Sequence, residues 1–245
     1  MRNLIVLVVL ALALAGLIGV NRLAGSWHYV MSAPSGELMY VAAFDADADD
    51  FNADWEQYGG RLSAQISDGV MRIEAGEVNS GPYSAAAPYF ADFDARVDAW
   101  ALSGPENNGY GMIFRLVDRR NYYLFLVSSD GYYQVRRVVD GDEKELSTWI
   151  ESPLVNTGFD AVNQLRVVAR GDQFQFFVNG EQVQVCIPNN PDAMSTYFMD
   201  TCIDGQMFDT LTDDSIAQGR IGVVAAALEQ PDVVVAFDNL VVYSP

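Results

Sequence analysis

The sequence predicts an all-β sandwich that follows one apolar N-terminal helix. Strand-length runs rich in Val, Ile, Phe and Tyr recur along the chain, and short turns of Asp, Asn and Gly separate them. No long amphipathic helical period follows residue 24. Strands at this spacing with little helix are typical of a two-layer sandwich or a barrel. The 245 residues are ordinary for a single β-domain behind an N-terminal segment.

Composition narrows the classes of partner. Half of the residues are apolar and 12% are aromatic, so the chain can bury a sizeable core. The formal net charge is −19, and a surface this acidic repels phosphate backbones. We therefore expect no nucleic-acid partner. The charge suits an extracytoplasmic surface, cation binding or a basic partner, and solubility alone also explains it.

Residues 1–24 predict a membrane segment. The apolar run 4–20 is at the short limit of a membrane span. A cleaved signal peptide would use the small residues Ala13 and Ala15, but the apolar run continues beyond them, which favours an uncleaved signal anchor. We expect residues 3–20 to contact membrane lipid in a single pass of the cell membrane. The N-terminus would lie inside and the β-domain on the extracytoplasmic side.

The next residues, 25–36, predict a juxtamembrane linker before a β-domain that spans 37–245. Alternating or continuous apolar patterns predict its first strands. These expected strands are Glu37–Phe44, Arg61–Ile66, Val70–Glu74, Pro82–Ala87 and Phe93–Leu102. The hairpin between the second and third uses Ser67-Asp68-Gly69 as its turn.

Residues 110–142 predict a three-stranded meander. Its turns fall at Asp118–Asn121, Ser129–Gly131 and Asp140–Asp142. The later strands are expected at Glu145–Ile150, Asn163–Arg170, Asp172–Val178, Gln182–Val185, Arg220–Ala227 and Val233–Tyr243. Asn179-Gly180 between two apolar runs is the strongest hairpin signal in the chain, because a type I′ turn needs positive φ at both central positions.

Residues 186–218 interrupt this rhythm and predict a long inserted loop. The segment holds both cysteines of the chain, Cys186 and Cys202. In an exported protein they are expected to form a disulfide that closes the loop. Such a closure stabilises by about 3 kcal/mol in the chain-entropy model. The alternative is two free thiols in a reducing compartment.

Several segments in order carry a family resemblance. They are DDF and the following W, DFDARVDAW, YGMIFRLVDRRNYYLFLVSSDGYY, NQLRVVARGDQFQFFVNG, GRIGV and FDNLVV. From about Phe44 to Val242 the chain resembles the concanavalin A-like lectin/glucanase superfamily, and most of all its bacterial 3-keto-disaccharide hydrolase-like domains. The resemblance implies an antiparallel two-sheet jelly roll whose curved sheet holds a saccharide. It is weakly specific for function, because one sandwich hosts many activities.

The residues give little support to an enzyme. Family-16-type glucanases of this superfamily carry an E-x-D-x-(x)-E run, which puts a nucleophile and an acid about 5 Å apart on one strand. The nearest run here, Asp92 to Asp98, lacks Glu. The single histidine, His28, falls in the linker and argues against a Ser-His-Asp triad. A hydrolase therefore rests on the resemblance alone.

Calcium is the only cofactor that the sequence suggests. Asp45, Asp47 and Asp49 occupy positions 1, 3 and 5 of an EF-like loop, but position 6 is Asp50 where Gly is required. An EF-hand is therefore rejected. The resemblance implies a structural Ca²⁺ where the first and last strands meet, with Asp45, Asp47 and Asp238 as ligands. The alternative is that these are solvated turn acids.

Saccharide binding needs aromatic faces beside polar groups. Strict alternation places Arg96, Asp98 and Trp100 on one face of a strand. If that face is concave, side chains of the meander would join it. The candidate ligand residues are Arg96, Asp98, Trp100, Arg115, Tyr123 and Arg136. The alternatives are that Arg115 pairs with Asp98 across a sheet and that the aromatic residues are core, Trp149 above all.

Three functions follow as hypotheses. The first is a membrane-anchored, non-catalytic module that binds carbohydrate or another component of the cell envelope. The second is an accessory subunit that docks onto a membrane complex through the anchor and the loop 186–218. The third is a hydrolase of the keto-disaccharide type. An exposed polar and aromatic groove would favour the first, a buried insertion the second, and clustered carboxylates the third.

Overall fold

A computed structural model describes residues 28–45 and 54–245, which contain strands and turns but no α-helix. The all-β prediction is confirmed for this part of the chain. The expected anchor at residues 1–24 and the candidate calcium ligand Asp47 lie outside it. Among the described residues, no helix has the length and apolarity that crossing a membrane requires.

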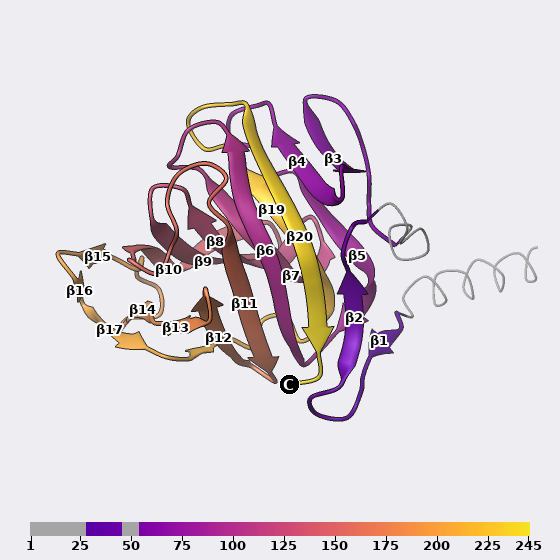
Figure 1. Cartoon of the computed structure of the whole chain (residues 1–245). Helices are drawn as coiled ribbons and strands as arrows, with labels where there is room; N and C mark the ends of the chain where they lie inside the picture. Colours follow the sequence, from indigo (N-terminus) through magenta and orange to yellow (C-terminus); the bar gives the residue numbers. More distant parts are fainter. Residues whose placement is uncertain (1–27, 46–53) are drawn as a thin grey trace, which may run out of the picture.

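Two sheets face each other across one core (Figure 1). Sheet A runs in the order β1 (Val30–Met31), β5 (Tyr83–Phe90), β19 (Gly219–Ala226), β7 (Gly109–Asp118), β8 (Asn121–Ser128), β9 (Tyr132–Val139) and β10 (Asp142–Glu151). The main path of sheet B is β13 (Glu181–Val183), β12 (Gln173–Val178), β11 (Asn163–Arg170), β6 (Phe93–Ser103), β20 (Val233–Tyr243), β4 (Val70–Ala75) and β3 (Leu62–Ser67). In addition, β2 (Leu38–Ala42) pairs with β20, and β18 (Leu211–Thr212) pairs with β12.

Almost every pairing is antiparallel, and β1 beside β5 is the parallel exception. The part of the predicted linker that is described therefore joins sheet A through β1. Strands distant in sequence are neighbours, since β19 lies between β5 and β7, and β20 lies between β6 and β4. The two C-terminal strands thus complete one sheet each.

The hairpin turns follow the predicted chemistry. Asn179 and Gly180 have φ of 52° and 88°, which is the type I′ pattern. Asp68 and Gly69 repeat it with φ of 53° and 79°. Because Asn, Asp and Gly adopt positive φ at low cost, these turns fix the register of their strands locally.

The core between the sheets is built from inward-facing aromatic side chains. Phe114 and Phe125 of sheet A meet Phe174 and Phe176 of sheet B, with ring centroids 5.6 Å apart for Phe114–Phe174 and 5.0 Å apart for Phe125–Phe176. All four are buried. Burying one such side chain stabilises the fold by about 2 kcal/mol, so this contact layer is a main source of stability.

The residues predicted as a long loop contain two short β-ribbons. One pairs β14 (Val185–Pro188) with β17 (Gly205–Phe208), and the other pairs β15 (Tyr197–Phe198) with β16 (Thr201–Cys202). The predicted disulfide Cys186–Cys202 is present and links the two ribbons. In Figure 1 they project from the side of the sandwich away from β1 and β2.

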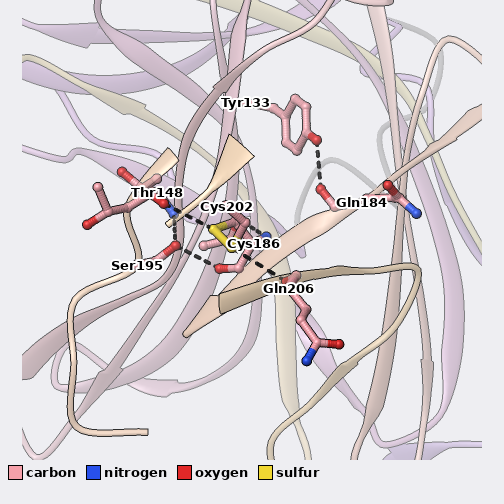
Figure 2. Close-up of a disulfide and its surroundings, with 9 residues drawn as sticks. Tyr133, Thr148, Gln184, Cys186, Ser195, Cys202 and Gln206 are labelled. Carbon is pink, nitrogen blue, oxygen red and sulfur yellow. Dashed lines mark hydrogen bonds between the residues drawn. A yellow bond between two sulfur atoms is a disulfide. The ribbon is translucent and has the colours of Figure 1, made fainter. Parts of the chain in front are cut away.

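Side chain to backbone hydrogen bonds hold this insertion on β10. The Ser195 hydroxyl donates to the Cys186 carbonyl at 2.7 Å and accepts from the Thr148 N–H at 3.0 Å, as Figure 2 shows. The Cys186 N–H donates to the Ser147 hydroxyl at 3.0 Å. Gly205 is required here, because a Cβ would lie 2.4 Å from the Ile187 carbonyl oxygen. The insertion is therefore a built feature of the fold.

Candidate functional site

The outer face of sheet A carries a second apolar cluster, separate from the core. We call this surface the sheet A face. Its buried members are Ala85, Ile113, Leu116, Leu126 and Val224. Four larger, partly exposed side chains pack over them: Tyr83, Tyr122, Leu124 and Trp149. Three aromatic side chains thus lie on the outside of a sheet that is already buried on its inner side.

Strand register brings these residues together. Val224 of β19 lies opposite Tyr83 of β5 on one side and opposite Gly111 of β7 on the other. Leu126 of β8 lies opposite Gly111 and also opposite Gln134 of β9. Residues opposite each other in adjacent strands point to the same face, so this row runs across five strands. The sheet A face is therefore continuous across the sheet.

Trp149 extends from β10 towards the middle of the sheet. A Cβ at Gly109 of β7 would lie 3.2 Å from the Trp149 Cη2 and 3.1 Å from the Leu126 Cδ1. The indole thus reaches across β9 and β8 to β7, and the missing side chain at Gly109 leaves room for it. A flat ring held along a sheet in this way forms a platform for a ligand ring.

A pocket of about 600 Å³ opens on the same face. Its apolar side is formed by residues of four neighbouring strands of sheet A: Tyr83, Ile113, Tyr122, Leu124, Val224 and Ala226. Its other lining residues come from the segment around Tyr58, the start of β3 at Leu62, the loop between β4 and β5, and the β7–β8 turn. This is the usual make-up of a small-ligand site, an apolar floor with a few polar groups around it.

The polar ends of the aromatic residues have no partner in the described part of the chain. No hydrogen bond there involves the Tyr83 hydroxyl, the Tyr122 hydroxyl or the Trp149 indole N–H, and none of the three is a buried unsatisfied atom. Burial, followed by the nearby Glu143 carboxylate, raises the pKa of Tyr122. Its hydroxyl is therefore a protonated donor at neutral pH.

Arg136 is the predicted ligand residue that lies on this face. Its guanidinium pairs with Glu143 at 2.6 Å and with Glu145 at 3.5 Å, and it also contacts the Gln134 side-chain oxygen. The Gln134 side chain is fully buried, and its Nε2 has no hydrogen-bond partner in the described chain. Arg136 is thus oriented by Gln134, Glu143 and Glu145, and it lies close enough to Tyr122 to affect the pKa of that hydroxyl.

Arg115 does not lie on the face where the sequence placed it, because a local irregularity turns its side chain inward. It has φ of 47° at a register shift between β7 and β8, and its side chain is buried. The guanidinium donates to three carbonyl oxygens, those of Ile216 at 2.7 Å, Ala91 at 3.1 Å and Gly171 at 2.5 Å. It therefore ties three loops together, and the alternative pairing with Asp98 is wrong because Asp98 belongs to sheet B.

Tyr123 is also part of the core. Its ring stacks on Phe114 with centroids 5.4 Å apart, and its hydroxyl donates to Asp213 at 2.6 Å. Asp213 also accepts from Arg137 at 2.6 Å. The network fastens the end of the insertion to β8 and β9. The two adjacent tyrosines of β8 point to opposite faces, with Tyr122 on the sheet A face and Tyr123 in the core.

Arg96, Asp98 and Trp100 share one face as predicted, but it is the outer face of sheet B. The meander belongs to sheet A, so these residues cannot join Arg136 in one site. This correction could not come from the strand pattern, because alternation does not say which sheet a strand enters.

On this outer face of sheet B, the acidic side chains are already bonded to neighbouring side chains. Arg166 donates two hydrogen bonds of 2.7 Å to Asp94, and Arg96 donates two more at 3.1 and 3.5 Å. Burial alone would raise the pKa of Asp94, but these hydrogen bonds hold it below its usual value. Asp98 accepts from Gln164 at 3.3 Å and from Asn239 at 3.0 Å.

Two of the predicted calcium ligands are near each other. Burial raises the pKa of Asp238, and the carboxylates of Asp45 and Asp98 raise it further. Within residues 28–45 and 54–245, no group of three carboxylate, histidine or cysteine side chains is placed to hold a metal ion. Since Asp47 lies outside the described residues, the calcium site stays a prediction.

The three aromatic residues that form the candidate site were not among the predicted ligand residues. They are Tyr83, Tyr122 and Trp149. The one available signal was β8, whose sequence NYYLFLV is apolar on both faces. A strand of this kind must bury both sides or line a ligand surface with one of them. The pattern does not say which of two adjacent tyrosines faces the other sheet.

No protein-family model and no curated protein matches the chain. Solved structures do. The carbohydrate-binding module CBM66 from Bacillus subtilis is 15% identical over 78% of this chain and 96% of its own, with a TM-score of 0.54. A Bacillus subtilis protein of unknown function with a galectin-like fold is 13% identical over 86% and 97%, with a TM-score of 0.57. The Crh5 transglycosylase without ligand is 13% identical over 89% and 87%, with a TM-score of 0.56. The described chain therefore shares the two-sheet, galectin-like jelly-roll fold of these structures.

Proposed function

We propose that the protein is a non-catalytic saccharide-binding module of the cell envelope and that the sheet A face is its binding surface. The observation that carries this proposal is the set Tyr83, Tyr122 and Trp149, whose rings are held on one face while their polar ends have no partner among residues 28–45 and 54–245. Solved structures of the same fold include a module described as carbohydrate-binding.

The chemistry of the face suits a sugar. A pyranose ring presents C–H groups on its flat sides and hydroxyls around its edge. Aromatic side chains pack against the flat sides, and polar groups at the ring ends bond the hydroxyls. Here the Trp149 platform and the aromatic pocket supply the first, and Arg136, Glu143 and the tyrosine hydroxyls supply the second. A pocket of about 600 Å³ lies within the usual size range of small-ligand sites.

The carboxylates favour binding over hydrolysis. Retaining glycosidases need two carboxyl groups about 5 Å apart, one of them protonated as an acid. On the sheet A face, Glu143 and Glu145 both pair with the Arg136 guanidinium, so both carboxylates are engaged by the same cation. Asp94 is bound to two arginines on the other sheet. A keto-disaccharide hydrolase remains the alternative that the sequence resemblance suggests.

The proposed location follows from the N-terminal segment. Residues 3–20 would anchor the module to the cell membrane in a single pass, with the jelly roll on the extracytoplasmic side. The disulfide Cys186–Cys202 supports an oxidising compartment, where such bonds persist. An anchored module of this kind would hold envelope glycan near the membrane.

A glycan array with the purified β-domain attached to its anchor in detergent tests the function. The variants are Trp149→Ala and Tyr122→Ala on the sheet A face, and the matched control is Trp100→Ala on the outer face of sheet B. We expect wild type and Trp100→Ala to bind the same glycans. Both variants of the sheet A face should lose at least tenfold in affinity, because central aromatic residues dominate such surfaces. Binding that depends on Trp100 and not on Trp149 would refute the site.

A second candidate function is docking to a membrane complex, and the tip of the insertion favours it. Phe198 is 62% exposed and Met199 is 80% exposed at the β15–β16 turn, where Met199 has φ of 47°. A non-glycine residue in this conformation is costly and is retained mainly where function needs it. No lysine, arginine or histidine occurs between Arg170 and Arg220. The chemistry fits an apolar socket rimmed by basic residues on a partner protein.

Purification from native membranes at low detergent tests this candidate. Phe198→Ser should release a partner that wild type retains, whereas Phe159→Ser, at a residue 44% exposed on another loop, should retain it. The partner should also dissociate faster at high salt, because its contacts include exposed charges. A monodisperse monomer from wild type under these conditions would argue against docking.

A further inference from the structure

The charges around the sheet A pocket leave one cation unpaired. Three charged side chains line the pocket, namely Glu56, Glu77 and Arg119. Glu56 pairs with Arg220 of β19, and Glu77 pairs with Arg61 at 3.6 Å. Arg119 makes no hydrogen bond or ion pair within the described chain. After each acid is matched with its own arginine, the pocket retains the single positive charge of Arg119.

The turn between β7 and β8 explains why Arg119 is free. The carboxylate of Asp118, its neighbour in sequence, accepts from the Arg120 N–H at 2.8 Å and from the Asn121 side chain at 3.0 Å. Asp118 thus closes the turn and does not pair with Arg119. The Arg120 guanidinium bonds the Asp140 carbonyl. Arg120 therefore supports the fold, whereas the adjacent Arg119 lines the pocket.

Unpaired arginines are uncommon in the part of the chain that the structure describes. Among the described arginines, Arg170 at the end of β11 is the other one without a hydrogen bond or ion pair. The remaining ones bond carboxylates or backbone carbonyls, as an acidic surface makes easy. In a chain of net charge −19, an exposed guanidinium that pairs with no acid of residues 28–45 and 54–245 stands out. Arg170 lines a smaller pocket of about 190 Å³ with other residues of sheet B, whereas Arg119 is the one that lines the aromatic pocket of the sheet A face.

We propose that the pocket selects a saccharide that carries an anionic group, a carboxylate, sulfate or phosphate, and that Arg119 binds this group. The inference rests on the proposed saccharide-binding function of the same face. Tyr83 and Tyr122 pack against the sugar, and the charged substituent lies at the β7–β8 end of the pocket, where Arg119 is. The planar guanidinium donates two parallel hydrogen bonds to such a group.

The net charge of the molecule does not oppose this selection at physiological ionic strength. Charges farther apart than about 8 Å are largely screened there. The anionic group therefore senses mainly the charges at the pocket, where Glu56 and Glu77 are each paired with an arginine. The electrostatic influence of Arg119 on the nearby Tyr58 hydroxyl, whose pKa is raised mainly by burial, agrees with a guanidinium directed towards the pocket.

The test uses pairs of oligosaccharides that share a backbone and differ in charge. The pairs are oligogalacturonide and its methyl ester, sulfated and unsulfated isomalto-oligosaccharide, and phosphorylated and unphosphorylated mannotriose. Affinities are measured by calorimetry with the full chain in detergent. The variants are Arg119→Gln and, as the matched control, Arg170→Gln, which removes the same charge from an exposed arginine on the other sheet.

We expect wild type and Arg170→Gln to bind the anionic member of at least one pair about tenfold more tightly than the neutral member. Arg119→Gln should remove this preference and leave affinity for the neutral member unchanged. The preference should also shrink in 1 M NaCl. The pair that shows it identifies the anionic group.

Three results would overturn the inference. Equal binding of both members by wild type would refute it and leave the saccharide-binding function intact. A preference that persists in Arg119→Gln would refute the role of Arg119. No binding of any of the six oligosaccharides, together with no binding on the glycan array, would refute the inference and the proposed function together.

Discussion

The two outer faces of the sandwich differ in how their polar groups are satisfied. On the outer face of sheet B, Asp94 is held by Arg166 and Arg96, and Arg166 lies over the Phe177 ring at 4.5 Å from its centroid. On the sheet A face, aromatic side chains cover an apolar cluster while their hydroxyl and indole groups have no partner in the described chain. On the outer face of sheet B the charged groups bond one another, and we call it the closed face. On the sheet A face the polar groups have no partner among the described residues, and we call it the open face.

The difference separates stability from binding. A charged side chain on a closed face is already bonded, so replacing it costs folding free energy. An aromatic side chain on an open face contributes its contact area to whatever covers it, so replacing it costs affinity. We therefore expect mutations on the outer face of sheet B to affect unfolding and mutations on the sheet A face to affect ligand binding.

The largest expected effect on stability is that of Asp94→Asn. The Asp94 side chain is 12% exposed and pairs with two arginines that are 29% and 38% exposed. Loss of one partner from a buried ion pair costs about 3 kcal/mol, and the exposure of the arginines reduces this to about 2 kcal/mol. Urea unfolding measures the change. The control Glu74→Gln, from an ion pair 41% exposed on both sides, should cost less than about 0.5 kcal/mol. Equal losses of unfolding free energy in the two variants would contradict a stabilising role for the Asp94 ion pairs.

The next effect is that of Trp149→Ala on saccharide affinity, at least tenfold, with the array ligand titrated by calorimetry. Asp94→Asn should leave this affinity within twofold of wild type at temperatures where it is folded. The reverse pattern, with Trp149→Ala affecting only unfolding, would show that the sheet A face is a closed face as well.

The two faces should also differ in their response to pH. The pKa of Asp94 is held below 3.8 in the folded protein, so its contribution to stability is present above that value and is lost as pH falls through the lower folded pKa. Stability below pH 4 should therefore fall less steeply in Asp94→Asn than in wild type, by about 1 kcal/mol over two pH units. Saccharide affinity should stay constant from pH 6 to 9, because burial keeps Tyr122 protonated. A loss of affinity near pH 9 would contradict this.

The smallest expected effect is that of salt. Raising NaCl from 0.05 to 1 M should increase Tm by a few degrees, because the net charge of −19 repels itself and salt screens that repulsion. The destabilisation by Asp94→Asn should change by less than about 0.5 kcal/mol over the same range, since its ion pairs are largely shielded from solvent. Thermal unfolding of both proteins measures it, and a falling Tm would rule out net repulsion as a destabilising force.

The local pattern was enough to place the strands. The alternation in Phe93–Ser103 and the Asn179-Gly180 turn each depend on a few consecutive residues, and both match the structure. The disulfide could also be predicted, because the chain has only two cysteines. The placement of Trp149 could not be predicted, since its position over Gly109 depends on four strands, β7 to β10, that meet only in the folded sheet.

By itself, the sequence determined the class of fold, the turns, the disulfide and the alternation of faces along each strand. These depend on backbone geometry and on side chains within a few residues of each other. The tertiary structure decided which sheet each strand enters and which side of β8 meets the core. Period two assigns Tyr122 and Tyr123 to opposite faces, but only packing against Phe114 and Phe174 puts Tyr123 inside. For that reason the candidate site contains Tyr122 and Trp149 in place of Tyr123 and Trp100.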